Sequence, residues 1–292
     1  MTQPLKIAAL QMVSTPDVDR NLAAASRLME AAAADGVRLV ALPEYFCLLG
    51  RNDRDKLAIA EALDDGPIQA HLAAAARRLG LWLIGGTLPL RLDRPIGDPD
   101  PDPDLDAQPG PDPDAQSERV LNSCLVWSPT GQRVARYDKI HLFAFDNGQE
   151  RYDEGRVLQA GTAPVAVDVE GWRIGLSICY DLRFPELYRA LMQPPCDLIV
   201  VPSAFTHTTG AAHWELLLRA RAVENQCYVL APAQGGRHEN GRRTWGHSLL
   251  ADPWGEVLAC QPEGEAVVAG TLDRERLAAV RKQLPALAHR RL

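Results

Sequence analysis

Short runs of consecutive apolar residues alternate with longer segments in which apolar residues recur every three or four positions. The first run, residues 5–11, predicts a strand, and the next segment predicts a helix that is capped by Asn21 and ended by Gly36. A second apolar run, residues 38–42, stops just before Glu44. Near-continuous apolar strands separated by helices are typical of parallel strands that are buried on both faces.

The same order of elements recurs in the second half of the chain. Residues 172–178 predict a strand that stops at Cys179, residues 185–192 predict a helix, and residues 197–201 predict another strand. The repeat indicates two β-α-β units and therefore an α/β fold.

Further elements are expected between and after these two units. They are a helix at 68–79, a strand at 81–85, a hairpin-like pair at 123–127 and 132–137, strands at 227–231, 248–251 and 266–272, and a helix at 274–283. We therefore expect residues 1–292 to form a single domain that ends in a C-terminal helix and tail at 274–292.

The net charge of −7 comes from one segment. Residues 93–118 hold eight aspartates and one glutamate against one arginine, so the rest of the chain sums to about +1. This Pro/Asp-rich segment has almost nothing to bury, and we expect a mobile surface insertion rather than a calcium site. The remaining sequence has no basic stripe, so we expect no nucleic-acid partner.

Apolar residues make up 46% of the chain, yet no run approaches the roughly 18 apolar residues that a membrane-spanning helix needs. The N-terminus also lacks a basic region followed by an apolar run, so we expect no signal peptide. The six cysteines have neither CxxC nor Cys/His spacing, which argues against zinc. We expect reduced thiols in a cytoplasmic protein that binds no membrane and no metal.

Two chemically active side chains stand at the ends of predicted strands. Cys179 lies where a strand ends and a helix begins, and a helix N-terminus favours the nucleophilic thiolate. Glu44 ends the corresponding strand of the first unit, where poor solvation would raise its proton affinity and suit a general base. A buried structural cysteine and a helix-capping carboxylate are the alternatives when each residue is taken alone.

Lys139 is notable because lysine is scarce in this chain. There are only four lysines against 27 arginines, so a lysine beside an apolar segment indicates a need for a compact ammonium group. Such a group can stabilise the oxyanion of a tetrahedral intermediate. A surface lysine whose stem covers apolar residues is the ordinary alternative.

These residues lie in the segments LPEYF (42–46), YDKIHLF (137–143) and SICYDLRFPELYR (177–189). In this order and with these surroundings, the segments resemble the three signatures of the nitrilase superfamily of carbon–nitrogen hydrolases. Secondary matches are PSAFT (202–206), RARAVENQCYVLAPAQ (219–234) and GHSLLADPWGEVLA (246–259). The resemblance extends from about Leu5 to Leu272, interrupted by residues 93–118.

The resemblance implies a four-layer α-β-β-α sandwich that normally pairs into a homodimer, and a reaction without metal or organic cofactor. It also implies that Glu44, Lys139 and Cys179 are the catalytic residues and that the backbone N–H of Tyr180 is a second oxyanion donor. Glu44 would take the proton of Cys179, the thiolate would attack an amide carbon, and a thioester would form with release of ammonia before water frees the acid.

Members of this superfamily often carry a second essential glutamate after the lysine signature. Glu154, seven residues before Gly161, best matches that position in this sequence, and Glu150 is the rival.

Among branches of the superfamily, the sequence looks most like the deaminated-glutathione amidases and omega-amidases. The expected substrate is therefore a small amide that carries a carboxylate. Arg183, four residues after the nucleophile, could bind that carboxylate; an ion pair with Asp181 or Glu186 is the alternative. Thr206 is expected to line the same pocket.

Three other functions remain open at this point. An N-carbamoyl amino acid amidohydrolase would share Arg183. A Cys-His hydrolase would pair Cys179 with His141 or His213. A non-catalytic interaction protein would need none of these side chains.

Overall fold

A computed structural model describes residues 4–92, 119–148 and 151–291. The predicted mobile insertion at 93–118 and the rival glutamate Glu150 lie outside the described residues.

The first half of the chain builds most of an eight-stranded sheet, here called sheet 1. Its strands run in the order β18-β1-β2-β3-β5-β4, with β6 and β9 paired to β5. Their bounds are β1 Leu5–Gln11, β2 Leu39–Ala41, β3 Trp82–Ile84, β4 Leu88–Arg91, β5 Val120–Trp127, β6 Arg133–Asp138, β9 Leu158–Gln159 and β18 Ala266–Leu272. β1, β2 and β3 are parallel, while β18 pairs antiparallel with β1, so that Leu5 lies opposite Leu272.

The second half builds a six-stranded sheet, here called sheet 2, in the order β10-β11-β12-β13-β16-β17. Its strands are β10 Val165–Val169, β11 Trp172–Leu176, β12 Leu198–Val200, β13 Tyr228–Ala231, β16 Ser248–Ala251 and β17 Val257–Gln261. β11, β12 and β13 are parallel, as the two-unit pattern predicts. Two small ribbons lie outside the sheets: β7 (Ala144–Asp146) with β8 (Arg151–Asp153), and β14 (Gly235–Arg237) with β15 (Arg243–Trp245).

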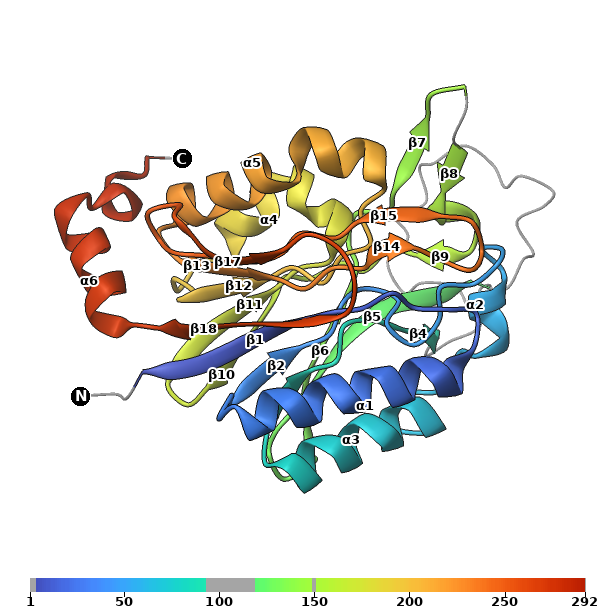
Figure 1. The fold of residues 1–292 in the computed structure, drawn as a ribbon. Coiled ribbons are helices and arrows are strands. Elements are labelled where there is room, and N and C mark those ends of the chain that lie inside the picture. Colours follow the sequence, from blue (N-terminus) through green and yellow to red (C-terminus); the bar gives the residue numbers. More distant parts are fainter. Residues whose placement is uncertain (1–3, 93–118, 149–150, 292) are drawn as a thin grey trace, which may run out of the picture.

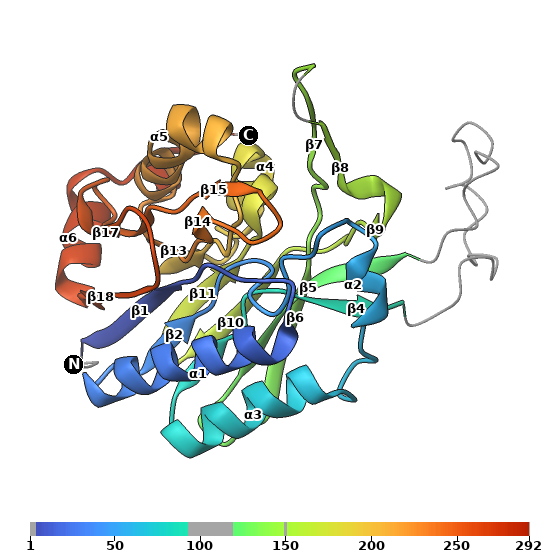
Figure 2. The same ribbon diagram turned by 45° about the vertical axis from the view of Figure 1, so that its right-hand side comes forward.

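Helices cover the outer faces of both sheets (Figure 1). On sheet 1 these are α1 (Val18–Ala34) and α3 (Pro67–Leu79), and on sheet 2 they are α4 (Pro185–Ala190) and α5 (His207–Asn225). α6 (Arg274–Gln283) follows β18, and the short α2 (Asp55–Ala58) lies near β4. The predicted four-layer α-β-β-α sandwich is thus confirmed. Figure 2 shows the β7–β8 ribbon projecting from this sandwich.

The pleat of β1 shows how the layers are held together. Ile7 and Ala9 belong to the apolar core shared with sheet 2, whereas Ala8 and Leu10 pack in the core beneath α1 and α3. Since successive side chains of a strand point to opposite faces, a strand buried on both sides must be apolar throughout. This explains the continuous apolar runs in the sequence.

One detail of the predicted elements is wrong, and one helix was not predicted. The N-cap of α1 is Asp17, whose side chain accepts a hydrogen bond from the backbone N–H of Arg20, and not Asn21. The side chain of Asn21 instead donates to the backbone oxygens of Thr15 and Cys47. The long helix α5 had no prediction, because its mixed sequence lacks a clear apolar stripe.

In the part of the chain that the structure describes, no helix has both the length and the apolar character required to cross a membrane.

Candidate active site

The two parallel-strand units bring Glu44 and Cys179 to one cavity. Glu44 follows β2, Cys179 follows β11, and both line one cavity that is connected to solvent. The backbone N–H of Cys179 donates to the carbonyl of Pro202, just after β12, at 2.9 Å. In α/β folds, ligand sites gather at the carboxyl ends of parallel strands. The convergence that the sequence predicts is therefore present.

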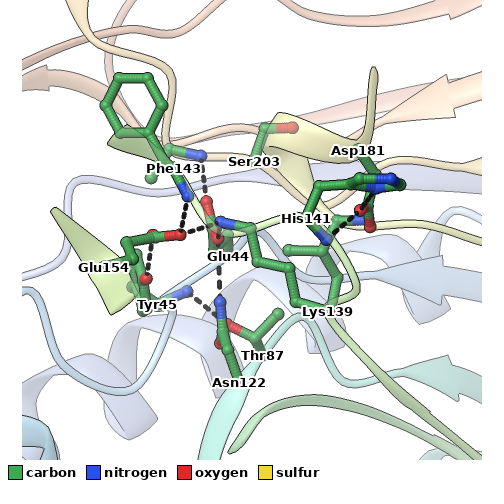
Figure 3. Close-up of polar contacts among 12 residues, drawn as sticks. Glu44, Tyr45, Thr87, Asn122, Lys139, His141, Phe143, Glu154, Asp181 and Ser203 are labelled. Atoms are coloured by element: carbon green, nitrogen blue, oxygen red, sulfur yellow. Dashed lines mark hydrogen bonds and ion pairs between the residues drawn. The ribbon is translucent and has the colours of Figure 1, made fainter. Parts of the chain in front are cut away.

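Lys139 lies between two carboxylates in the interior. Its Nζ is 2.9 Å from Oε1 of Glu44 and 2.7 Å from Oε2 of Glu154, and its side chain is 0% exposed (Figure 3). Burying an ammonium group is costly unless it is paired and hydrogen-bonded, and these two carboxylates satisfy that need. A snorkelling surface lysine, the ordinary alternative for this residue, is excluded.

Glu44 is held by hydrogen bonds on both oxygens. Besides Lys139, Oε1 accepts from Nδ2 of Asn122 at 3.0 Å (Figure 3). Oε2 accepts from the backbone N–H of Ala204 at 3.0 Å. Burial raises the pKa of Glu44, although the positive charge of Lys139 opposes this change. A carboxylate with raised proton affinity in a fixed orientation suits a general base.

The helix dipole that was expected to favour the thiolate of Cys179 is not the main influence on its pKa. Burial and the negative charge of Glu44 raise the pKa of Cys179 well above its ordinary value, and Lys139 only partly offsets them. The helix that begins at this residue is a single short turn, Cys179–Arg183, so its dipole is small. The resting thiol is therefore protonated, and a base must remove its proton before it can attack.

The backbone adopts a left-handed conformation just after each of the two strands. Cys179 has φ of 47° and Tyr45, next to Glu44, has φ of 56°. This left-handed region is unfavourable for residues other than glycine, at a cost of about 1–3 kcal/mol each. The sharp turn at Cys179 leaves its side chain on the cavity wall.

Glu154 occupies the position predicted for a second glutamate. Its side chain accepts from the hydroxyl of Tyr45 at 2.6 Å and from the backbone N–H of Phe143 at 2.7 Å, in addition to Lys139 (Figure 3). Burial alone would raise the pKa of Glu154, but the charges of Lys139 and Lys56 outweigh it and hold this pKa below its usual value. Glu154 is thus an anion that fixes Lys139.

Arg183, Tyr180 and Thr206 line the same cavity, as expected. The guanidinium of Arg183 lies 5.4 Å from the ring of Phe205 and 5.9 Å from that of Tyr180, and its Nη1 is 3.3 Å from Nδ1 of His213. Thr206 is the N-cap of α5.

The alternative ion pair of Arg183 with Asp181 or Glu186 does not form within the residues described. Asp181 instead accepts hydrogen bonds from the hydroxyl of Tyr137 at 2.7 Å and from the backbone N–H of Ile178 at 2.8 Å. Arg183 therefore presents a charged group to the cavity without a carboxylate partner in this part of the chain.

Neither histidine of the Cys-His alternative is among the described residues that line the cavity. His141 lies 2.7 Å from Oδ1 of Asp181 and stacks on Phe184 at a ring distance of 3.7 Å, which is a structural role. Across the described ranges, no group of three or more His, Cys, Asp and Glu is placed to hold a metal ion.

The sequence prediction missed three cationic residues of the cavity wall, Lys56, Arg242 and Arg243. For Lys56 a signal was present, because the scarcity of lysine that singles out Lys139 applies to it equally. The two arginines are close to the cavity only because the β14–β15 ribbon folds back over it, and no local pattern predicts that.

Comparisons with known proteins agree with this geometry. The family model for carbon-nitrogen hydrolases matches residues 6–282. The chain is 37% identical over 291 residues to the deaminated glutathione amidase of Synechocystis sp., covering 99% of this chain and 98% of that protein.

Two solved structures have the same fold over almost the whole chain. The Caenorhabditis elegans NitFhit protein has a TM-score of 0.83 at 37% identity, covering 99% of this chain and 66% of that longer chain. Saccharomyces cerevisiae Nit3, a member of branch 10 of the nitrilase superfamily, has a TM-score of 0.80 at 28% identity, covering 97% of this chain and 95% of that one. With a matching family model over nearly its full length, the chain belongs to the carbon-nitrogen hydrolases of the nitrilase superfamily and is an amide hydrolase.

Proposed function

We propose that the protein hydrolyses deaminated glutathione, with Cys179 as nucleophile, Glu44 as general base and Lys139 as oxyanion stabiliser. The observation that carries this proposal is the buried Glu44–Lys139–Glu154 cluster on one side of a cavity that Cys179 also lines. The substrate comes from the name of the Synechocystis relative, to which nearly the whole chain is similar.

In the first step Glu44 accepts the proton of the Cys179 thiol as sulfur attacks the amide carbon. The carbonyl oxygen becomes an oxyanion, which Lys139 and the backbone N–H of Tyr180 stabilise. Lys139 suits this role because two carboxylates already hold its ammonium group in place, so little reorganisation is needed during the reaction.

In the second step the tetrahedral intermediate collapses, the carbon–nitrogen bond breaks, and the departing nitrogen takes the proton from Glu44. A thioester on Cys179 remains. Glu44 then accepts a proton from water, hydroxide adds to the thioester, the thiolate leaves, and Glu44 passes the proton to it. With deaminated glutathione the departing group is the amine of the Cys-Gly dipeptide. The ammonia expected from the sequence would come only from simple ω-amides.

Arg183 is the proposed partner of the carboxylate on the acyl side of the substrate. Its guanidinium lines the cavity and has no carboxylate partner in the described ranges. Arginine binds carboxylates well because its planar donors match both oxygens.

A substrate panel tests this proposal. Wild type and Cys179→Ala are assayed with deaminated glutathione, 2-oxoglutaramate and an N-carbamoyl amino acid, and the released amine, ammonia and acid are quantified. We expect deaminated glutathione to give the highest kcat/KM in wild type, and no turnover of any substrate by Cys179→Ala. A higher kcat/KM for the N-carbamoyl amino acid would overturn the proposed substrate.

The role of Arg183 is tested separately. Arg183→Ala should raise KM for amides with an acyl-side carboxylate by roughly 10-fold or more, the usual effect of losing a hydrogen bond between charged groups. Arg78→Ala is a matched control, because Arg78 lies on α3 and pairs with Glu30 at the surface. An unchanged preference for acidic over neutral amides in Arg183→Ala would contradict this role.

We also propose a cytoplasmic homodimer. All six cysteines, which lie within the described ranges, are free thiols, and this supports a reducing compartment. Leu216 and Val223, seven residues apart on α5, are 69% and 49% exposed, which supports pairing through this helix. Light scattering should give the mass of a dimer for wild type and of a monomer for Leu216→Glu; a monomeric wild type would contradict pairing.

A further inference from the structure

Lys56 is a buried cation that the mechanism above does not use. It lies on α2, its residue is 8% exposed, and it lines the cavity that contains Cys179. Within the described residues, only the carboxylate of Asp53 lies within 4 Å of its ammonium group, at 3.8 Å. This separation is longer than a hydrogen bond, so the ammonium group is incompletely paired. A buried charge of this kind is stabilised by an anion that enters the cavity.

Arg242 places a second positive charge next to Lys56. Its Nη2 is 3.0 Å from the same Oδ1 of Asp53, and its guanidinium lies 5.5 Å from the ring of Tyr152. Arg242 and Tyr152 also line the cavity. Two cations thus share the carboxylate of Asp53, while the negative charge of Glu154 also acts on Lys56.

This pair of cations is separate from Arg183. Arg183 contacts Tyr180, Phe205 and His213, which follow β11 and β12 on the side of sheet 2. Lys56 and Arg242 contact Tyr45, Asp53 and Tyr152, and the two sets share no residue. One cavity therefore offers a carboxylate two different positions.

Tyr45 indicates which end of the substrate faces Lys56. The ammonium group lies 4.6 Å from the centre of its ring, while its hydroxyl donates to Glu154 at 2.6 Å. Glu154 in turn binds Lys139, which binds Glu44, the group that protonates the departing nitrogen in the proposed mechanism. Lys56 thus lies beside this cluster and apart from Arg183, so that, with Arg183 at the acyl carboxylate, the position at Lys56 is left for the departing amine.

We propose that Lys56 and Arg242 form a second carboxylate-binding site, which selects amides whose departing amine carries a carboxylate. This inference rests on the proposed function and refines it. In deaminated glutathione the carboxylate of the terminal glycine would occupy this site, while the carboxylate of the acyl part binds Arg183. Simple ω-amides release ammonia and have no group for the second site.

The test compares deaminated glutathione with an analogue whose terminal glycine carboxylate is replaced by a carboxamide. The measured quantity is the ratio of kcat/KM for the acid to kcat/KM for the carboxamide. We expect this ratio to fall roughly 10- to 100-fold in Lys56→Met, the range for losing one hydrogen bond between charged groups. The same change at Lys282, which is exposed on α6, should leave the ratio unchanged.

The ratio separates binding from an indirect effect on Glu154. If Lys56 acts only by positioning Glu154, both substrates lose activity equally, the ratio stays constant, and the inference is wrong. Arg242→Met provides the same measurement should Lys56→Met fold poorly. A wild type that does not hydrolyse deaminated glutathione would overturn the proposed function itself, whereas an active wild type with unchanged ratios in both variants overturns only the second site.

Discussion

Replacing Lys139 with methionine tests the central cluster most directly. Methionine fills a similar volume but removes the ammonium group that lies 2.9 Å from Glu44 and 2.7 Å from Glu154. Both carboxylates would then be buried without a counter-charge between them. Removing one partner of a buried ion pair usually costs about 3–5 kcal/mol of folding free energy, and we expect a loss in this range at pH 7.

The same substitution has a predictable dependence on pH. Without Lys139, burial and mutual repulsion hold the pKa values of the two carboxyls above those of the unfolded chain, so the folded variant binds more protons. Its stability is then greatest at low pH and is lost as pH rises through the raised pKa values. The difference between Lys139→Met and wild type should therefore be larger at pH 8 than at pH 5.5.

Urea unfolding followed by circular dichroism at both pH values measures these differences. Lys6→Met is the matched control, because Lys6 pairs with Asp35 on the surface, with 37% of its side chain exposed. A surface pair of this kind contributes at most about 1 kcal/mol. Equal stability of Lys139→Met and Lys6→Met, or a larger deficit of Lys139→Met at pH 5.5 than at pH 8, would refute the reasoning.

Three further predictions follow from the site. Burial raises the pKa of Glu44 above the ordinary glutamate value of 4.5, and catalysis needs its ionised form. The kcat/KM should therefore fall toward acid pH with a midpoint above 4.5, and a midpoint at or below this value would argue against Glu44 as the base. Asp181→Ala should lower the unfolding free energy by about 3 kcal/mol or more, since it strands the buried hydroxyl of Tyr137 and the N–H of Ile178; calorimetry would show this. Gly86→Ala should lower the unfolding free energy by about 2 kcal/mol or more and reduce activity. The φ of Gly86 is 58°, and a Cβ at this position would lie 2.2 Å from the carbonyl oxygen of Pro43, next to Glu44. A stable and fully active variant would contradict this prediction.

The strand ends were the most predictable part of the site. Residues 38–42 and 172–178 are apolar because their strands are covered on both faces, and this pattern alone places Glu44 and Cys179 at strand ends. The pattern carries this information because burial acts on every position of a strand. Glu154, in contrast, was indicated only by the resemblance to the nitrilase superfamily.

The remaining features depend on contacts between distant segments. The pKa of Cys179 follows from burial and from the charge of Glu44, and neither can be obtained from a helix that follows it in sequence. Lys56 and Arg242 come together through Asp53 and the β14–β15 ribbon, which have no common local pattern. Packing between distant segments determines where Lys56 and Arg242 lie, so their place in the site could be found only from the structure.

The pairing of β1 with β18 has a consequence for biosynthesis. β1 leaves the ribosome long before its antiparallel neighbour β18 is made, since Leu5 pairs with Leu272. Until then one edge of β1 has no partner, and such edges recruit other chains. Closing a pairing between segments so far apart is also slow. Cells that overproduce this protein should therefore benefit from more chaperone, which protects the nascent chain until β18 is made.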